Sequence, residues 1–138
     1  MTAREYLERV REAEARAERL RQRAENLRML LTDTAMHLRD VPESRGTDLQ
    51  RNEAIYAEID ALERESREAE EEAQAIRAEV GLAICRIEDP VIQRVLMMRY
   101  LEGMKWREVA AKIGCCIAQV YRYRDIGYAE LEKTSEIK

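Results

Sequence analysis

The chain has 138 residues, the length of one domain or of a small domain with a helical extension. Charged residues make up 38% of it, aromatic residues only 5%, and 5 glycines and 2 prolines are too few for a β-sandwich or barrel. Three cysteines do not form a disulfide scaffold, and no apolar run is long enough for a transmembrane helix or a signal peptide. We therefore expect a cytoplasmic, all-α protein.

The net charge of −4 conceals two parts of opposite sign. Residues 1–90 contain 15 basic and 22 acidic residues, a net −7, whereas residues 91–138 contain 9 basic and 6 acidic residues, a net +3. The asymmetry indicates two tasks, and the basic part is the one expected to bind an anionic partner.

Two heptad repeats predict a pair of amphipathic helices. Thr2-Ala3-Arg4-Glu5 has the spacing of a capping box, so the first helix is expected to begin there. A proline and a glycine interrupt the helical signal over about 40–47, and a second capping box at 47–50 predicts the next helix start. Apolar or small residues form the seam of each helix: Tyr6, Val10, Ala13, Ala17, Leu20, Ala24, Leu27, Leu31, Thr34 and Leu38, then Ile55, Ile59, Leu62, Ser66, Ala69, Ala73, Ile76, Val80, Ala83 and Ile87.

The two seams match when the chain folds back on itself. In antiparallel register Leu31 faces Leu62 and Ala24 faces Ala69, and the other pairs follow without a slip. We expect an intramolecular hairpin roughly 50 Å long, from a rise of ~1.5 Å per residue. A pairing between chains would use the same residues. Because alanine-rich layers bury little surface, we expect two copies to associate into a four-helix dimer.

The basic part has the pattern of a helix-turn-helix. Asp89 followed by Pro90 is a helix start signal. We predict helices over residues 91–102, 106–113 and 117 to about 132. Ala110 supplies the small residue where two helices cross, Gly114 supplies the turn, and Val120 supplies an apolar residue early in the second helix.

At this point the sequence resembles a known family. The segment from Arg99 to Gly114 looks like the start of the region-four helix-turn-helix of bacterial sigma factors, and residues 119–123 continue the resemblance. The whole chain is similar to small phage proteins that join a long helical half to a sigma-like domain, such as the ArpU- and RinA-like late-gene transcription regulators. The match covers roughly residues 88–131. It implies a DNA-binding regulator with host RNA polymerase as a possible further partner.

Three residues depart from that family's pattern. Lys105 and Cys116 stand where serine is common, at positions that we expect to be helix N-caps, and loss of a cap costs about 1 kcal/mol. Arg107 stands where an acidic residue is common. The start of the short helix is therefore more basic, which favours contact with phosphates.

Docking of such a motif places the start of its second helix against base edges in the major groove. The outward residues there are the expected base contacts: Ile117, Ala118, Gln119, Tyr121 and Arg122. Glutamine suits adenine and arginine suits guanine, each through two hydrogen bonds. The basic residues around them are the expected phosphate contacts: Lys105, Arg107, Lys112 and Arg124.

The sequence offers no site for catalysis. The cysteines lack metal-ligand spacing, and there is no phosphate-binding loop and no nucleophile motif. We therefore expect no enzyme, no cofactor, no metal and no small-molecule substrate.

These observations lead to one interpretation and two alternatives. Residues 1–88 are expected to form a hairpin that self-associates, and residues 89–138 a sigma-like domain that binds double-stranded DNA as a sequence-specific phage or prophage transcription regulator. No membrane partner is expected. One alternative is a small terminase subunit or other DNA-packaging adaptor, which combines the same parts in a ring. The other is a coiled-coil protein-interaction module that does not bind DNA.

Overall fold

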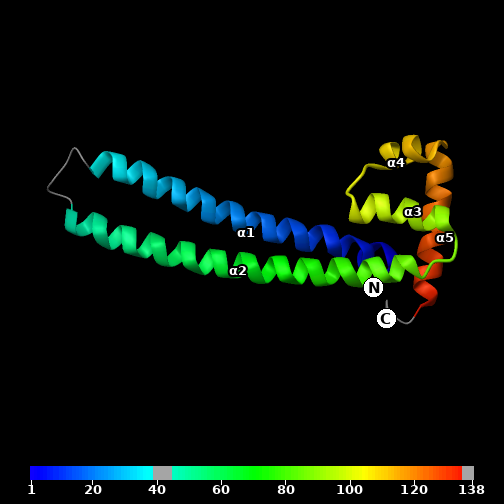
Figure 1. The fold of residues 1–138 in the computed structure, drawn as a ribbon, viewed down its shortest axis with the longest axis horizontal. Helices are drawn as coiled ribbons and strands as arrows, with labels where there is room; N and C mark the ends of the chain where they lie inside the picture. The colour runs from blue at the N-terminus through cyan, green and yellow to red at the C-terminus, as the bar shows by residue number, and fades with distance from the viewer. Residues whose placement is uncertain (39–44, 135–138) are drawn as a thin grey trace. The chain divides into compact units, whose positions relative to one another are not determined.

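A computed structural model of the chain describes residues 1–38 and 45–134, with side chains for residues 1–32 and 49–134. All regular secondary structure in these ranges is helical (Figure 1), so the predicted all-α class is confirmed. The elements are α1 (Ala3–Leu38), α2 (Arg45–Cys85), α3 (Pro90–Leu96), the π-helical segment η2 (Met97–Leu101), α4 (Trp106–Ile113) and α5 (Ile117–Lys133). None of the described helices combines the length and apolar character needed to cross a membrane.

Contacts divide the chain into two compact units. We call residues 14–71 the hairpin unit, and residues 1–13 together with the chain from residue 72 onward the terminal unit. Both long helices contribute to each unit. The boundary between the units therefore falls inside α1 and α2.

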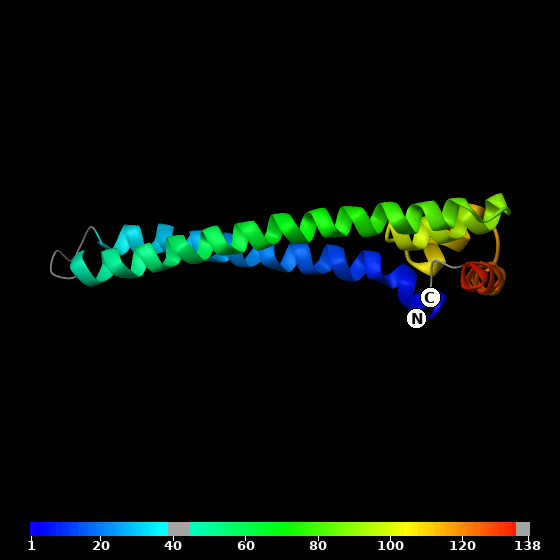
Figure 2. The ribbon, with the colours of Figure 1, turned by 90° about the horizontal axis from the view of Figure 1, so that it is seen from below.

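In the hairpin unit α1 and α2 lie side by side and run in opposite directions (Figures 1 and 2). Leu20 and Ala24 of α1 form an apolar cluster with Leu62 and Ala69 of α2. An ion pair between Arg28 and Glu63 also joins the two helices.

The heptad pattern correctly identified the buried face of both helices. Every predicted seam residue with a described side chain is buried or half-buried. Thr34, Leu38 and most of the predicted loop at about 40–47 lie outside what the structure describes. The predicted start of the second helix is wrong by three residues, because a capping box at Thr47 places the first helical residue at 48, whereas α2 already begins at Arg45.

The terminal unit begins with the predicted capping box. The Glu5 N–H donates to Thr2 Oγ1 over 3.2 Å, and the Thr2 N–H donates to Glu5 Oε2 over 3.1 Å. Two residues outside the heptad seam, Leu7 and Ile84, are fully buried here. They belong to one cluster with residues of α3 and α5, among them Ile92, Leu96 and Leu131. The ends of α1 and α2 therefore bury a second face, which a heptad pattern alone does not predict.

The junction between α2 and α3 follows the Asp-Pro signal. The Asp89 carboxylate accepts from the Val91 N–H over 2.9 Å, and Pro90 occupies the first helical position. The side-chain amide of Gln93 donates to the carbonyl of Cys85, the last residue of α2, and to that of Ile87 in the segment that follows. These bonds satisfy carbonyl groups that a helix end leaves without intrahelical partners.

The prediction of one regular α-helix over 91–102 is wrong beyond Leu96. The chain continues as a π-helical turn, in which the Glu102 N–H donates to the Met97 carbonyl over 3.0 Å, five residues back. Met98 and Tyr100 within this turn are buried. A π-helical turn is rare, and such turns occur frequently at functional sites.

The two helices of the predicted helix-turn-helix lie where the sequence placed them. Gly114 ends α4 in the left-handed conformation, with φ of 82°, and the N–H groups of Gly114 and Cys115 both donate to the Ala110 carbonyl. Val109 of α4 and Val120 of α5 are fully buried and pack in one cluster. The buried valines fix the crossing of α4 and α5.

Candidate nucleic-acid interface

The nine residues predicted from the sequence to contact DNA lie around the two ends of α4 and in the first half of α5. Five of them are exposed: Lys105, Arg107, Lys112, Ala118 and Arg122. The other four are half-buried: Ile117, Gln119, Tyr121 and Arg124. Within the side chains that the structure describes, the three basic residues of this region that precede α5 form no ion pair.

Gln119 on the first turn of α5 and Arg122 on the second lie close together. The Arg122 Nη1 atom donates to Gln119 Oε1 over 3.5 Å, a long and weak hydrogen bond. Among the described side chains no carboxylate pairs with Arg122. Its guanidinium is thus available for two hydrogen bonds to guanine, and the Gln119 amide for two to adenine. Ala118 is exposed one turn before Arg122, where a small apolar side chain can contact a thymine methyl group.

The two positions expected to be helix N-caps are indeed N-caps. Lys105 precedes α4 and Cys116 precedes α5, both with extended backbone, and neither side chain makes a capping hydrogen bond. The first N–H groups of both helices are therefore left to other acceptors, since each helix begins with unpaired backbone donors.

Arg124 lies apart from the exposed face of Arg122. Its Nε and Nη2 atoms both pair with Asp125 at 3.0 Å, and its guanidinium carbon lies 4.7 Å from the centre of the Tyr121 ring. The same carbon lies 5.7 Å from the ring of Trp106 and 5.9 Å from that of Tyr128. Both Arg124 and Tyr121 are thus occupied by packing against aromatic rings.

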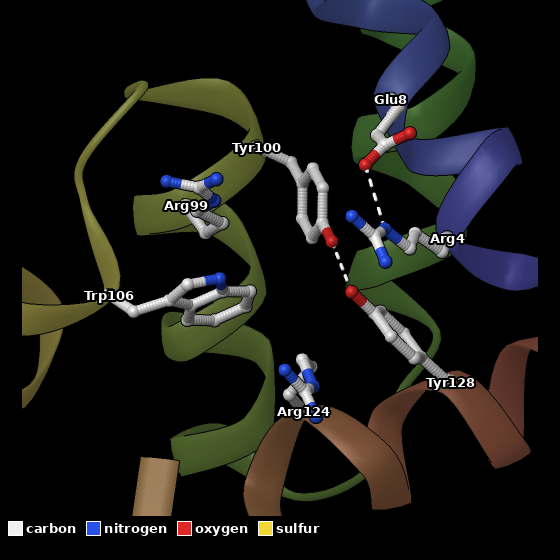
Figure 3. A pocket seen from close by; sticks show the side chains of 7 residues that line it. All are labelled: Arg4, Glu8, Arg99, Tyr100, Trp106, Arg124 and Tyr128. Carbon is white, nitrogen blue, oxygen red and sulfur yellow. Dashed lines mark hydrogen bonds and ion pairs between the residues drawn. The ribbon is translucent and has the colours of Figure 1, made fainter. Parts of the chain in front are cut away.

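Four rings form this aromatic cluster: Tyr100, Trp106, Tyr121 and Tyr128. Trp106 meets Tyr100 edge to face with ring centres 6.2 Å apart, and it meets Tyr121 in the same way at 6.1 Å. The hydroxyl groups of Tyr100 and Tyr128 share a hydrogen bond (Figure 3). Burial, and then this bond, raise the pKa of Tyr100, so its hydroxyl remains protonated at neutral pH.

Comparison with known proteins gives one family. Residues 30–132 match the family described as "Protein of unknown function (DUF1492)". The chain belongs to this family. No curated protein and no solved structure matches the chain. The DUF1492 match covers only the last nine residues of α1, then all of α2 and the chain up to Glu132 near the end of α5, so it includes the helix-turn-helix and part of the hairpin.

The aromatic cluster of this DUF1492 protein was not predicted from the sequence. A usable signal was present, because Tyr121, Arg124 and Tyr128 are spaced by three and four residues and therefore share one face of α5. Two rings on either side of an arginine indicate a guanidinium that packs against aromatic faces. Arg99, which joins the cluster from η2, carried no such signal.

Proposed function

We propose that this protein is a sequence-specific double-stranded DNA-binding transcription regulator that reads the major groove with the start of α5. The observation that carries the proposal is the pairing of Arg122, which is exposed and has no described carboxylate partner, with Gln119 in the first two turns of a helix that follows the Gly114 turn. The resemblance of residues 99–123 to sigma region four supports the same function and suggests a phage or prophage regulator. Host RNA polymerase is a further partner that rests on that resemblance alone.

In this proposal the base contacts and the phosphate contacts come from different elements. Ala118, Gln119 and Arg122 of α5 meet the base edges, with Ile117 at the rim. Lys105 and Arg107 at the start of α4, with Lys112 at its end, bind the backbone without reading sequence. Arg124 and Tyr121 act by holding α5 against Trp106.

The deciding measurement is DNA binding by fluorescence anisotropy, with fragments of the neighbouring genome, at two salt concentrations. We expect tight binding to one promoter-proximal fragment that survives the higher salt. Arg122→Ala should then weaken binding to that fragment by about 1–3 kcal/mol and change binding to random duplex much less, because it removes a base contact. Arg107→Ala should weaken binding to the specific fragment and to random duplex equally. It should also reduce the slope of log affinity against log salt concentration by about 1, the contribution of one phosphate contact.

Arg94→Ala is the matched control for the loss of one positive charge. Arg94 is exposed on α3 of the same unit and is not among the nominated residues. We expect it to bind both fragments like the wild type. Equal losses of specific and random binding in Arg122→Ala would reject base readout. Binding that is weak on every fragment and vanishes with salt would instead favour the interaction module without DNA binding.

We also propose that the hairpin unit associates with a second copy of the chain. Its described apolar cluster is small and consists in half of alanines, while Met29, Leu49 and Tyr56 are more than half exposed. Sedimentation equilibrium should give the mass of two chains, and Met29→Glu with Tyr56→Glu should shift it towards one chain. A ring-sized mass would favour the DNA-packaging adaptor, and a monomer at all concentrations would contradict self-association.

A further inference from the structure

A cavity of about 190 Å³ lies inside the terminal unit, next to the aromatic cluster (Figure 3). Its walls come from the first turns of α1, from η2, from the start of α4 and from α5. One water needs only ~10–15 Å³ of such space, so the cavity has room for a small polyatomic group. The residues that surround it come from both ends of the sequence, and none of them lies on the exposed face that carries Arg122.

The cavity is lined by more positive than negative side chains. Arg4, Arg99 and Arg124 contribute three guanidinium groups, and Glu8 contributes the one carboxylate among the lining residues. Glu8 is already bound to Arg4, whose Nε donates to Glu8 Oε1 over 2.9 Å. This net positive charge favours an anionic occupant mainly through Arg99 and Arg124, because the Arg4 side chain is exposed and its charge is screened by solvent.

Arg99 in particular lacks an anionic partner. Its Nη1 atom donates to the Met104 carbonyl over 3.0 Å, and its guanidinium carbon lies 5.1 Å from the centre of the Trp106 ring. Its Nε atom is buried without a hydrogen-bond acceptor. Within the side chains that the structure describes, no carboxylate pairs with Arg99. Of the Arg99 guanidinium, only Nη1 has an acceptor, and that acceptor is a neutral carbonyl, so the positive charge of Arg99 has no anion beside it in the part of the chain that the structure describes.

The other walls supply further donors rather than acceptors. Figure 3 shows the Trp106 indole between the guanidinium groups of Arg99 and Arg124. The hydrogen bond between Tyr100 and Tyr128 uses one of their two hydroxyl protons, so the other remains free to donate. A phosphate group matches this set, since its oxygens accept from several guanidinium groups and from a hydroxyl at once.

We propose that this cavity binds a phosphate group, either of a small phosphate monoester or of the DNA backbone. The proposal does not rest on the proposed base readout by α5. Arg99 is the principal ligand because no described carboxylate neutralises its guanidinium, and Arg124 is the second, held in place by Trp106 and Asp125. Arg4 adds positive charge from α1, so an occupied cavity ties the first turns of the chain to η2 and α5.

The chain contains its own reporter, because Trp106 is the single tryptophan of the sequence and lines the cavity. The full chain is titrated with inorganic phosphate, with adenosine monophosphate and with a random duplex, while Trp106 fluorescence is followed. Sodium chloride and sodium acetate at matched ionic strength are the controls. We expect a saturable change with phosphate or its monoester at millimolar concentrations or below, or with the duplex, and no saturable change with chloride or acetate.

Three variants assign the change to the cavity. Arg99→Gln and Arg124→Gln should each weaken binding of the active probe by roughly tenfold or more, because each removes a charge-assisted hydrogen bond. Arg94→Gln, on the exposed side of α3, should leave it unchanged. Circular dichroism melts confirm that each variant is folded, and the second arginine variant keeps the test decisive if the first fails to fold.

The probes separate the two sources of phosphate. A response to phosphate or the monophosphate assigns a small-molecule site. A response to the duplex alone, weakened by Arg99→Gln on every sequence, assigns a backbone contact. No response beyond that of acetate, or wild-type affinity in both arginine variants, overturns the proposal. Phosphate binding without any duplex binding would support the phosphate site in the cavity and reject the DNA-binding function. Sequence-specific DNA binding that Arg99→Gln does not change, without a response to phosphate, would support the DNA-binding function and reject the phosphate site.

Discussion

Replacing Leu7 by alanine is expected to lower the free energy of unfolding by about 2–5 kcal/mol, the usual range for truncating a buried leucine. Leu7 is fully buried in the cluster that also contains Ile84 of α2, Leu96 of α3 and Leu131 of α5. The substitution removes apolar surface from this cluster and leaves a cavity. Chemical unfolding in urea, followed by circular dichroism, measures the loss.

The matched control is Leu82→Ala, on α2 of the same unit. Leu82 is 62% exposed, so its truncation should change stability by no more than about 0.5 kcal/mol. Comparing the stability of the two variants tests whether α1 packs only through its heptad seam or also through the face that carries Leu7. In a hairpin that packs only through its heptad seam, Leu7 lies outside the seam and behaves like Leu82. Similar, small losses in both variants would therefore contradict the packing of residues 1–13 in the terminal unit.

The packing of residues 1–13 in the terminal unit has a functional consequence. The Ala3 N–H donates to Glu132 of α5 over 3.2 Å, and Arg4 lines the cavity beside Tyr128. The helix that we propose reads DNA is thus supported by the first turn of the chain, more than a hundred residues away in sequence. A fragment that starts at residue 89 lacks eight of the twelve buried residues of this cluster.

The sequence predicts best what depends on local rules. The Thr2–Glu5 capping box, the Asp89-Pro90 helix start and the Gly114 turn each require particular residues at short spacing, and all three are present in the structure. The heptad seam is also a local signal, because a period of 3.5 residues marks one buried face. It cannot reveal a second buried face, which is why Leu7 and Ile84 were not expected in the core.

Features that depend on distant elements escaped prediction. The π-helical turn at Met97–Leu101 has no spacing rule, and it places Arg99 and Tyr100 beside residues of α1 and α5. Arg124 reads in sequence as a phosphate contact near the start of a basic helix. Its actual surroundings follow from Trp106, a residue of another helix, over whose ring it lies. A charge pattern shows that a residue is basic but not what its side chain packs against.

Gly127→Val is expected to lower the free energy of unfolding by about 1–3 kcal/mol, the typical cost of overpacking a filled core. Gly127 is buried where α5 meets α3. A Cβ atom placed on it would lie 2.8 Å from Leu96 Cδ1 and 2.9 Å from Ile92 Cγ2, far inside normal contact distance. Both methyl groups belong to fully packed side chains, so neither can turn away without displacing another residue.

A double-mutant cycle with Leu96→Ala tests whether this close approach is the cause. Leu96→Ala alone removes the nearest methyl group and should destabilise through the cavity it leaves. Added to that variant, Gly127→Val should be less harmful than in the wild type, with a coupling of about 1–3 kcal/mol, while the close approach to Ile92 Cγ2 remains. Ala129→Val on the exposed side of α5 measures the intrinsic cost of valine in this helix, about 0.7 kcal/mol or less. If the effects of Gly127→Val and Leu96→Ala simply add, the loss of stability in Gly127→Val arises from helix propensity or from the unfolded chain. The packing of α5 against α3 would then not depend on the absence of a side chain at residue 127.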